Sequence, residues 1–192
     1  MIAIVKYNAG NIRSVINALN RLGVETMLTD DPEILRSSEK VIFPGVGEAK
    51  SAMAYLRDRG LDIVLKEMTQ PFLGICLGMQ LMCSFSEENY TECLGIFPER
   101  VRKFPATGKI PHMGWNNFVR VNGPLFKEIN IDDNMYFVHS YYVEEGPDTI
   151  ATTEYLLPFC SALHKGNYYG VQFHPEKSAA SGGRLLKNFL KL

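Results

Sequence analysis

The most informative absences in this 192-residue sequence concern membranes and charge. No stretch approaches the roughly 20 apolar residues that a membrane helix requires, and the apolar run at residues 2–5 is too short for a secretion signal. The 20 Lys and Arg residues nearly balance the 21 Asp and Glu residues, which leaves a net charge of −1. Because no broad basic surface results, neither a membrane nor a nucleic-acid partner is predicted.

Cysteine is also scarce, and its spacing excludes the common cysteine frameworks. The four cysteines, Cys76, Cys83, Cys93 and Cys160, form no CxxC pair and no metal-finger spacing. We therefore predict no metal site, no cofactor and no disulfide scaffold, but a cytoplasmic protein with reduced thiols. The length and the 46% hydrophobic content predict one globular domain over residues 1–192.

Strand and helix signals alternate along the first half of the chain. Short apolar runs predict strands over 2–5, 24–28, 41–43 and 72–75. Apolar residues at helical spacing predict helices over 12–22, 49–57, 61–68 and 77–85. The second half contains β-like segments at 114–121, 135–143, 150–153, 159–163 and 168–173, followed by an amphipathic helix. The predicted fold is α/β, with an open, mixed, mostly parallel sheet flanked by helices and with later strands that are partly antiparallel.

The segment Gly74-Ile-Cys76-Leu-Gly78 has the form of a nucleophile elbow in which cysteine replaces serine. An apolar strand precedes it and a helical pattern follows it, which is the context that the motif requires. Cys76 would then lie at a helix N-terminus, where free N–H groups favour the thiolate. The N–H of Leu77 is a candidate donor to an oxyanion. The alternative is a buried cysteine in a glycine-flanked turn.

A thiolate nucleophile needs a proton partner, and His174 is the best placed of the four histidines. It directly follows an apolar strand and precedes Pro175 and Glu176. On an extended chain, residues i and i+2 face the same side. We therefore expect His174 and Glu176 to project together and the carboxylate to orient the imidazole. The alternative is an exposed polar strand end.

The segment Pro44-Gly45-Val46-Gly47 follows another apolar strand. The two glycines permit unusual backbone angles, so the peptide N–H of Val46 is a candidate second oxyanion donor. Because its peptide can rotate, this loop is also a candidate switch. Glycine turns after strands are common, however, and the motif is weak on its own.

Together these residues resemble the class I, or triad, glutamine amidotransferases, which have a cysteine elbow, a glycine-rich oxyanion loop and a terminal His-x-Glu in this order. Within that family the chain is similar to the glutaminase subunits of imidazole glycerol phosphate synthases. The resemblance covers essentially the whole chain and is most specific at residues 44–47, 74–80, 111–116, 136–141 and 172–178. Segment 111–116, Pro-His-Met-Gly-Trp-Asn, separates this subfamily from other amidotransferases.

The resemblance implies that Cys76 is the nucleophile, His174 the general acid and base, and Glu176 its orienting partner. L-Glutamine would be cleaved to glutamate and ammonia through a thioester. The residues that family likeness places near the glutamine are Gly45, Gly47, Gln80, Glu88, His139, Ser140 and Tyr141. Three alternatives stay open: an exposed Gln80, a solvated Glu88, and a core pair of His139 and Tyr141 on one strand face.

The resemblance also implies a heterodimer, because the glutaminase unit takes up the whole chain. In the family, ammonia passes to a (β/α)8-barrel cyclase that makes imidazole glycerol phosphate and aminoimidazole carboxamide ribotide in L-histidine biosynthesis. The positions that match partner-facing ones are Asn11, Met113, Trp115, Tyr136 and Lys177. Trp115 is the only tryptophan, and its alternative role is that of a core aromatic.

Three other functions stay open at this point. The same glutaminase chemistry could serve another acceptor synthase, such as one that amidates a surface sugar. A stand-alone γ-glutamyl hydrolase would need no partner. A non-catalytic binding module is the third, and the intact set of Cys76, His174 and Glu176 argues against it.

Overall fold

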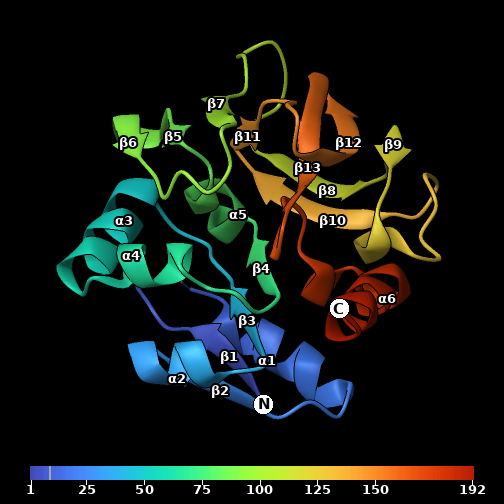
Figure 1. Ribbon diagram of the computed structural model, residues 1–192. Helices are drawn as coiled ribbons and strands as arrows, with labels where there is room; N and C mark the ends of the chain where they lie inside the picture. Colours follow the sequence, from blue (N-terminus) through green and yellow to red (C-terminus); the bar gives the residue numbers. More distant parts are fainter. Residues whose placement is uncertain (9) are drawn as a thin grey trace.

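Twelve strands form the main sheet in the part of the chain that the structure describes, residues 1–8 and 10–192 of the computed structural model (Figure 1). Its order is β2-β1-β3-β4-β14-β13-β11-β7-β5-β6, with β12 paired to β13 and β9 paired to β12. A separate two-stranded sheet pairs β8 with β10. The strand bounds are β1 Ile2–Val5, β2 Thr26–Thr29, β3 Lys40–Phe43, β4 Phe72–Ile75, β5 Phe85–Ser86, β6 Thr91–Glu92, β7 Arg100–Lys103, β8 His112–Asn116, β9 Arg120–Val121, β10 Met135–His139, β11 Tyr141–Val143, β12 Thr149–Tyr155, β13 Leu157–Lys165 and β14 Tyr168–Val171.

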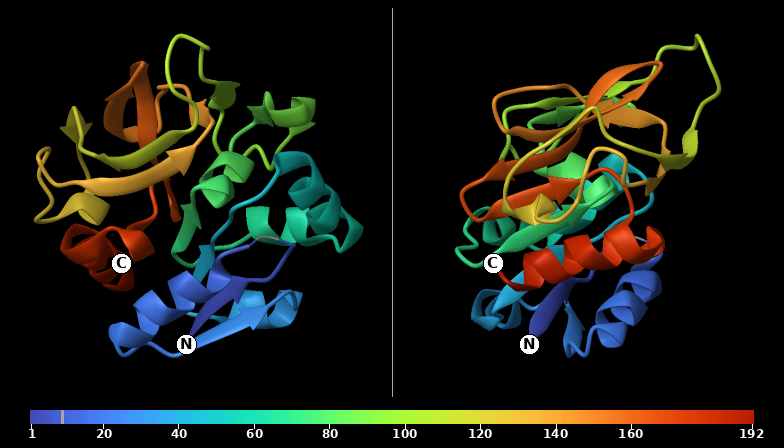
Figure 2. Two further views of the ribbon diagram at one scale, coloured as in Figure 1. Left: turned by 180° about the vertical axis from the view of Figure 1, so that it is seen from behind. Right: turned by 90° about the vertical axis from the view of Figure 1, so that its right-hand side faces the viewer.

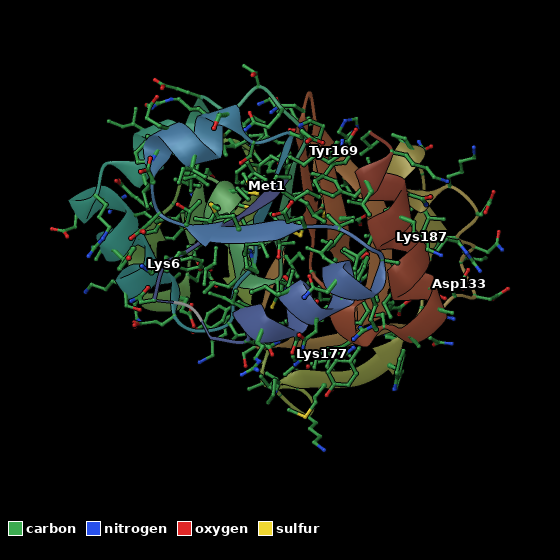
Figure 3. All side chains as sticks on the ribbon, turned by 90° about the horizontal axis from the view of Figure 1, so that it is seen from below. Met1, Lys6, Asp133, Tyr169, Lys177 and Lys187 are labelled. Carbon is green, nitrogen blue, oxygen red and sulfur yellow. The ribbon has the colours of Figure 1, made fainter. Side chains whose placement is uncertain are left out.

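Helices cover both faces of the parallel part of the sheet. Alternate residues of each strand point to opposite faces, so Ala3 and Val5 of β1 join one core cluster while Ile2 and Ile4 join the other. The first cluster includes side chains of α2 to α5, and the second includes those of α1 and α6. Figure 3 shows α1 and α6 near each other on one face, with α2 on the other. The helix bounds are α1 Ile12–Arg21, α2 Pro32–Ser37, α3 Ala49–Asp58, α4 Leu61–Lys66, α5 Leu77–Met82 and α6 Ala179–Leu190, and the 3-10 turns are η1 Glu88–Tyr90, η2 Pro124–Phe126 and η3 Pro175–Lys177.

The pairing changes from parallel to antiparallel at β14, the last strand of the chain, which lies in the middle of the sheet. Strands β2, β1, β3, β4 and β14 run parallel, whereas β14, β13, β11 and β7 pair antiparallel. In Figures 1 and 2 the parallel strands of the first half lie at one end of the molecule and the later strands at the other. The predicted fold class, including partly antiparallel later strands, is confirmed.

Two long predicted β segments are interrupted. Segment 135–143 breaks at Ser140 into β10 and β11, which belong to different sheets. Segment 114–121 likewise divides into β8, which begins earlier at His112, and β9. Both breaks occur where the chain leaves the small sheet, because β8 and β10 pair only with each other among the described strands.

The topology brings three notable strand ends together. Strands β3, β4 and β14 are adjacent and parallel. Their carboxyl ends lead into Pro44, Cys76 and the segment 172–174, respectively. Ligand sites of open parallel sheets form at this edge, so the fold places all the candidate catalytic segments side by side. None of the described helices is both long enough and apolar enough to cross a bilayer.

Candidate active site

Cys76 lies in a strained turn between β4 and α5. Its backbone has φ 53° and ψ −110°, a conformation that residues other than glycine rarely adopt. Glycine is required on both sides of Cys76, because other atoms lie too close to leave room for a side chain. A Cβ at Gly74 would lie 2.5 Å from the Met82 sulfur, and one at Gly78 would collide with the Phe43 carbonyl oxygen. The segment therefore has the strand, sharp turn and helix of a nucleophile elbow.

His174 and Glu176 form a buried hydrogen-bonded pair. Nδ1 of His174 lies 2.8 Å from Oε1 of Glu176, and the side chains are only 2% and 1% exposed. Burial alone would lower the pKa of His174, but the Cys76 thiolate and the Glu176 carboxylate outweigh burial and raise that pKa to about 10. The imidazole is therefore poised to hold a proton beside the Cys76 sulfur.

The backbone at this pair differs from the extended chain expected. Residues Pro175–Lys177 form the 3-10 turn η3, which begins at Pro175, so the prediction of an extended segment is wrong. Proline fixes φ near the helical value and is readily accommodated at the first helical position. The turn still brings Glu176 back onto His174, and Ser178 closes it by donating its hydroxyl to the His174 carbonyl at 2.6 Å.

The candidate oxyanion donors are turned away from a common point. The Leu77 N–H donates to the Gly45 carbonyl at 3.3 Å. Because the carbonyl and N–H of a trans peptide point in opposite directions, the N–H of Val46, in the same peptide as that carbonyl, points away from Leu77. The Val46 carbonyl in turn accepts from the Gly10 N–H at 3.2 Å. The Leu77 N–H is thus occupied by the loop, and the Val46 N–H points in the wrong direction to bind an oxyanion beside Leu77.

A cavity of about 270 Å³ opens beside Cys76. It contains most of the residues that the resemblance places near glutamine, together with both candidate oxyanion donors. Its lining comprises Val46, Gly47, Cys76, Leu77, Gln80, Glu88, Pro111, Val138, His139, Ser140 and Tyr141. Gly45, His174 and Glu176 do not line this cavity; they lie together beside Val46, where no water-sized space remains.

The structure decides two of the open alternatives for these residues. Gln80 is buried rather than exposed, and its Nε2 donates to the Tyr141 carbonyl at 3.0 Å and to Gln172 Oε1 at 2.9 Å. Glu88 is no free loop charge, since its Oε2 accepts from the Ala49 N–H at 2.7 Å. Burial raises the pKa of Glu88, although that hydrogen bond partly opposes the effect.

His139 is buried in the core and also lines the cavity. It ends β10, whereas Tyr141 begins β11, so the two residues do not share a strand face as expected. Nδ1 of His139 lies 2.7 Å from the Tyr141 carbonyl oxygen, and Nε2 lies 3.0 Å from Nδ1 of His112. Burial lowers the pKa of His139 to about 3 and that of His112 to about 4, so both rings are neutral.

The candidate partner residues lie on a surface built by the β8–β10 sheet and η3. Met113 and Trp115 are 60% and 55% exposed, so Trp115 is not a core aromatic. Trp115 lies directly opposite Tyr136 in the register, with ring centroids 5.9 Å apart. Lys177 is exposed near α1 and these strands (Figure 3). Asn11 differs from the others, because its Nδ2 donates to Glu176 Oε1 at 3.4 Å.

Sequence reasoning missed two residues at this site. Gln172 is fully buried, and its Nε2 lies 3.6 Å from the Cys76 sulfur. His112 supports His139 from the neighbouring strand. Both lie inside motifs already singled out, at residues 111–116 and 172–178. Only the pairing of distant strands shows that they contact the site.

With this geometry established, comparison with known proteins is decisive. A model of the family "Glutamine amidotransferase class-I" matches residues 3–192. The chain belongs to this family. Two relatives of this amidotransferase, each named imidazole glycerol phosphate synthase subunit HisH, come from Bacteroides fragilis strain YCH46 and Bacteroides thetaiotaomicron. They are 55% and 54% identical to it over 100% of this chain and 99% of theirs. The HisH subunit of Pasteurella multocida is 45% identical over 99% of this chain and 97% of its own.

Solved structures agree on the fold of the amidotransferase. A glutamine amidotransferase structure has a TM-score of 0.77 and 22% identity, covering 100% of this chain and 98% of that one. The structure of PurLQS from Thermotoga maritima has a TM-score of 0.71 and 17% identity, covering 99% and 97%. At these identities they show the fold alone. The predicted resemblance to class I amidotransferases is confirmed by the family match and by the HisH relatives.

Proposed function

We propose that this amidotransferase hydrolyses L-glutamine at Cys76 and transfers the ammonia to a (β/α)8-barrel cyclase subunit, with which it forms a heterodimer. The cyclase uses the ammonia to make imidazole glycerol phosphate and aminoimidazole carboxamide ribotide for L-histidine synthesis. The observation that carries the proposal is the Cys76 elbow beside the buried His174–Glu176 pair. The high identity to named HisH subunits supports the choice of pathway.

The proposed reaction follows from the side chains at the site. The Cys76 thiolate attacks the carboxamide carbon of glutamine, and the carbonyl electrons move onto oxygen. Protonated His174 then gives its proton to the leaving nitrogen, which departs as ammonia and leaves a glutamyl thioester. Water loses a proton to His174 as it attacks the thioester, which releases glutamate and restores the thiolate. Glu176 stabilises the imidazole of His174 in the steps in which it is protonated.

The proposal includes an oxyanion hole whose two N–H donors become available only on activation. Rotation of the Gly45–Val46 peptide would release the Leu77 N–H from the Gly45 carbonyl and turn the Val46 N–H toward the same point. The support is the present arrangement, in which the loop carbonyl occupies the Leu77 donor. Because one missing donor costs about 10²–10³ in kcat, this rotation is large enough to regulate glutamine hydrolysis.

We place the cyclase on the surface formed by Met113, Trp115, Tyr136 and Lys177. Exposed Met and aromatic side chains are enriched in the centres of protein interfaces. Asn11 belongs to the same region and also touches Glu176. Gly45 and six residues of the cavity lining are proposed to surround the glutamine; these six are Gly47, Gln80, Glu88, His139, Ser140 and Tyr141.

Two further proposals concern the chain as a whole. We propose that residues 1–192 form one amidotransferase domain, supported by the family match over residues 3–192. We also propose that it acts in the cytoplasm, which the four free cysteines support.

The test is a pull-down with the candidate cyclase, followed by a coupled assay. We expect a one-to-one complex that forms glutamate and imidazole glycerol phosphate in equal amounts from glutamine. Binding to a different acceptor synthase in place of the cyclase would redirect the proposal to that acceptor. Full glutaminase activity without any partner would favour a stand-alone γ-glutamyl hydrolase.

A further inference from the structure

We infer that Gln172 binds the sulfur of Cys76 through its side-chain N–H and stabilises the thiolate. The inference rests on the proposed role of Cys76 as the nucleophile. Gln172 is 0% exposed and directly follows β14, next to the strand that leads into Cys76. Its Nε2 lies 3.6 Å from the Cys76 sulfur, a normal distance for an N–H donor to sulfur.

The orientation of the Gln172 amide is fixed by its neighbours. A backbone carbonyl can only accept, so the side-chain NH2 of Gln80 must face the Tyr141 carbonyl, 3.0 Å away. The same NH2 reaches the Gln172 oxygen at 2.9 Å. If the Gln172 amide were reversed, two NH2 groups would face each other. The oxygen of Gln172 therefore points to Gln80, and its NH2 points to the sulfur.

Two buried histidines hold the Tyr141 carbonyl in turn. His139 donates its Nδ1–H to that carbonyl at 2.7 Å, so its Nε2 must accept, and it accepts from Nδ1 of His112 at 3.0 Å. Nε2 of His112 then accepts from the Asn116 amide at 3.3 Å. A single chain of hydrogen bonds thus runs from the end of β8 through Tyr141 and Gln80 to Gln172.

The chemistry of this contact favours the charged sulfur. A thiolate is a better acceptor than a thiol, so a fixed N–H donor stabilises the thiolate more. The charge of the Cys76 sulfur helps to raise the pKa of His174, but His174 must release its proton during each turnover. Gln172 has no proton to release, so its contact persists when His174 is neutral. Its contribution is to favour the thiolate whenever the sulfur is not acylated.

The experiment measures alkylation of Cys76 by iodoacetamide between pH 5 and 9 on the full chain, with the Cys76 peptide quantified by mass spectrometry. For Gln172→Met, which keeps the side-chain length but has no donor, we expect about tenfold slower alkylation at pH 6. The rising limb of the pH profile should move to higher pH, while the rate at pH 9 stays near that of the wild type.

Gln172→Glu is the second variant, and it allows the same measurement if Gln172→Met does not fold. It keeps an oxygen to accept from Gln80 but places a carboxylate beside the sulfur. We expect a larger loss than for Gln172→Met at pH 6 to 7. The control is Ser161→Ala, because Ser161 is also fully buried and its hydroxyl has no partner among the described residues. This control should leave the alkylation profile unchanged.

A double variant tests the fixed orientation. Gln80→Met should slow alkylation less than Gln172→Met, and Gln80→Met combined with Gln172→Met should be no slower than Gln172→Met alone. Wild-type profiles for both Gln172 variants would overturn the inference, and so would an equal shift in Ser161→Ala. If Cys76 is alkylated normally but the wild-type complex does not hydrolyse glutamine, the proposed function fails while the Gln172 contact stands.

Discussion

At the scale of single residues, the proposed reacting groups occupy energetically costly positions that the surrounding structure enforces. Cys76 has a positive φ, and the His174–Glu176 pair is almost completely buried. Such features cost free energy and persist only where neighbouring contacts hold them. Here the neighbours are the close backbone contacts of Gly74 and Gly78 and the Ser178 hydroxyl that closes the turn.

Replacing Cys76 should separate glutamine hydrolysis from the rest of the proposed function. We expect Cys76→Ala to lower kcat for glutamine by at least about a thousandfold, because none of the other three cysteines lines the cavity. The variant complex should still make imidazole glycerol phosphate from added ammonium salt, since the acceptor site belongs to the partner. Glutamate release at the wild-type rate would refute the assignment of Cys76.

The two members of the buried pair should differ in importance. Glu176 Oε1 accepts from both His174 and Asn11, and Glu176→Gln can keep an oxygen in that place while losing the charge. We expect a loss of about a hundredfold in kcat, against a larger loss for His174→Ala, which removes the proton carrier. Steady-state kinetics of both variants in the complex are the measurement. Equal or reversed losses would give Glu176 a different task.

Which site residues the sequence could reveal depends on how locally they are encoded. Cys76, His174 and Glu176 lie in contiguous motifs whose residue types and spacing are informative alone. The contact of Gln172 with Cys76 spans 96 residues and depends on the adjacency of β4 and β14. The 3-10 turn at Pro175 was missed because the i, i+2 pattern of an extended strand places His174 and Glu176 together equally well.

At the scale of secondary-structure elements, the β8–β10 sheet joins an exposed face to a buried one. Its outer side carries Met113 and Trp115, whereas His112 and His139 lie inside and pair across the strands. His112 stacks between Tyr155 and Phe137, with ring centroids 4.1 Å and 4.8 Å away. The inner face thus accepts neutral imidazole rings well and charged ones poorly.

This burial predicts acid sensitivity. Histidines whose pKa is lowered in the folded state contribute stability above about pH 6.5, and the contribution is lost as pH falls, because the unfolded chain takes up the protons. With pKa values of about 4 and about 3 for His112 and His139, we expect a loss of about 2 to 4 kcal/mol between pH 6.5 and 5. Urea unfolding at several pH values measures it.

The matched variant for that measurement is His112→Phe, which keeps the stacked ring. We expect it to be about 1–2 kcal/mol less stable at pH 7, because His139 loses its donor, but to lose less stability on acidification. His164→Gln, at a histidine more exposed than this pair, is the control and should lose as much as the wild type. An identical acid response in His112→Phe would assign the effect to other groups.

Element prediction worked best where burial on both faces leaves a continuous apolar run. Strands β1, β3 and β4 lie close to their predicted ranges for this reason. Helix α2 was missed because its six residues are too few for a periodic pattern, although Asp31 caps it through the Glu33 and Ile34 N–H groups. The strands β5 and β6 are also too short to give a periodic pattern. Only their pairing with neighbouring strands defines them.

At the scale of the whole molecule, the hydrogen bond from the Leu77 N–H to the Gly45 carbonyl predicts that the isolated chain is a poor glutaminase, because it occupies the proposed oxyanion donor. We expect kcat for glutamine to rise when the cyclase binds, and to rise by about 10²–10³ when its acceptor ligand or product is also present. The measurement compares the chain alone, the complex, and the liganded complex. Equal kcat values in all three states would exclude a switch and favour a stand-alone hydrolase.

One feature of the small sheet links these scales. The backbone of Tyr136 in β10 is tied on both sides to the loop of His174: its carbonyl accepts from the His174 N–H at 2.9 Å, and its N–H donates to the Ser178 hydroxyl at 2.9 Å. The strand that presents an aromatic ring to the surface therefore also positions His174. Under the proposed function, a substitution that reshapes this surface and shifts the β10 backbone would also displace the proposed proton carrier, so selection on one would act on the other.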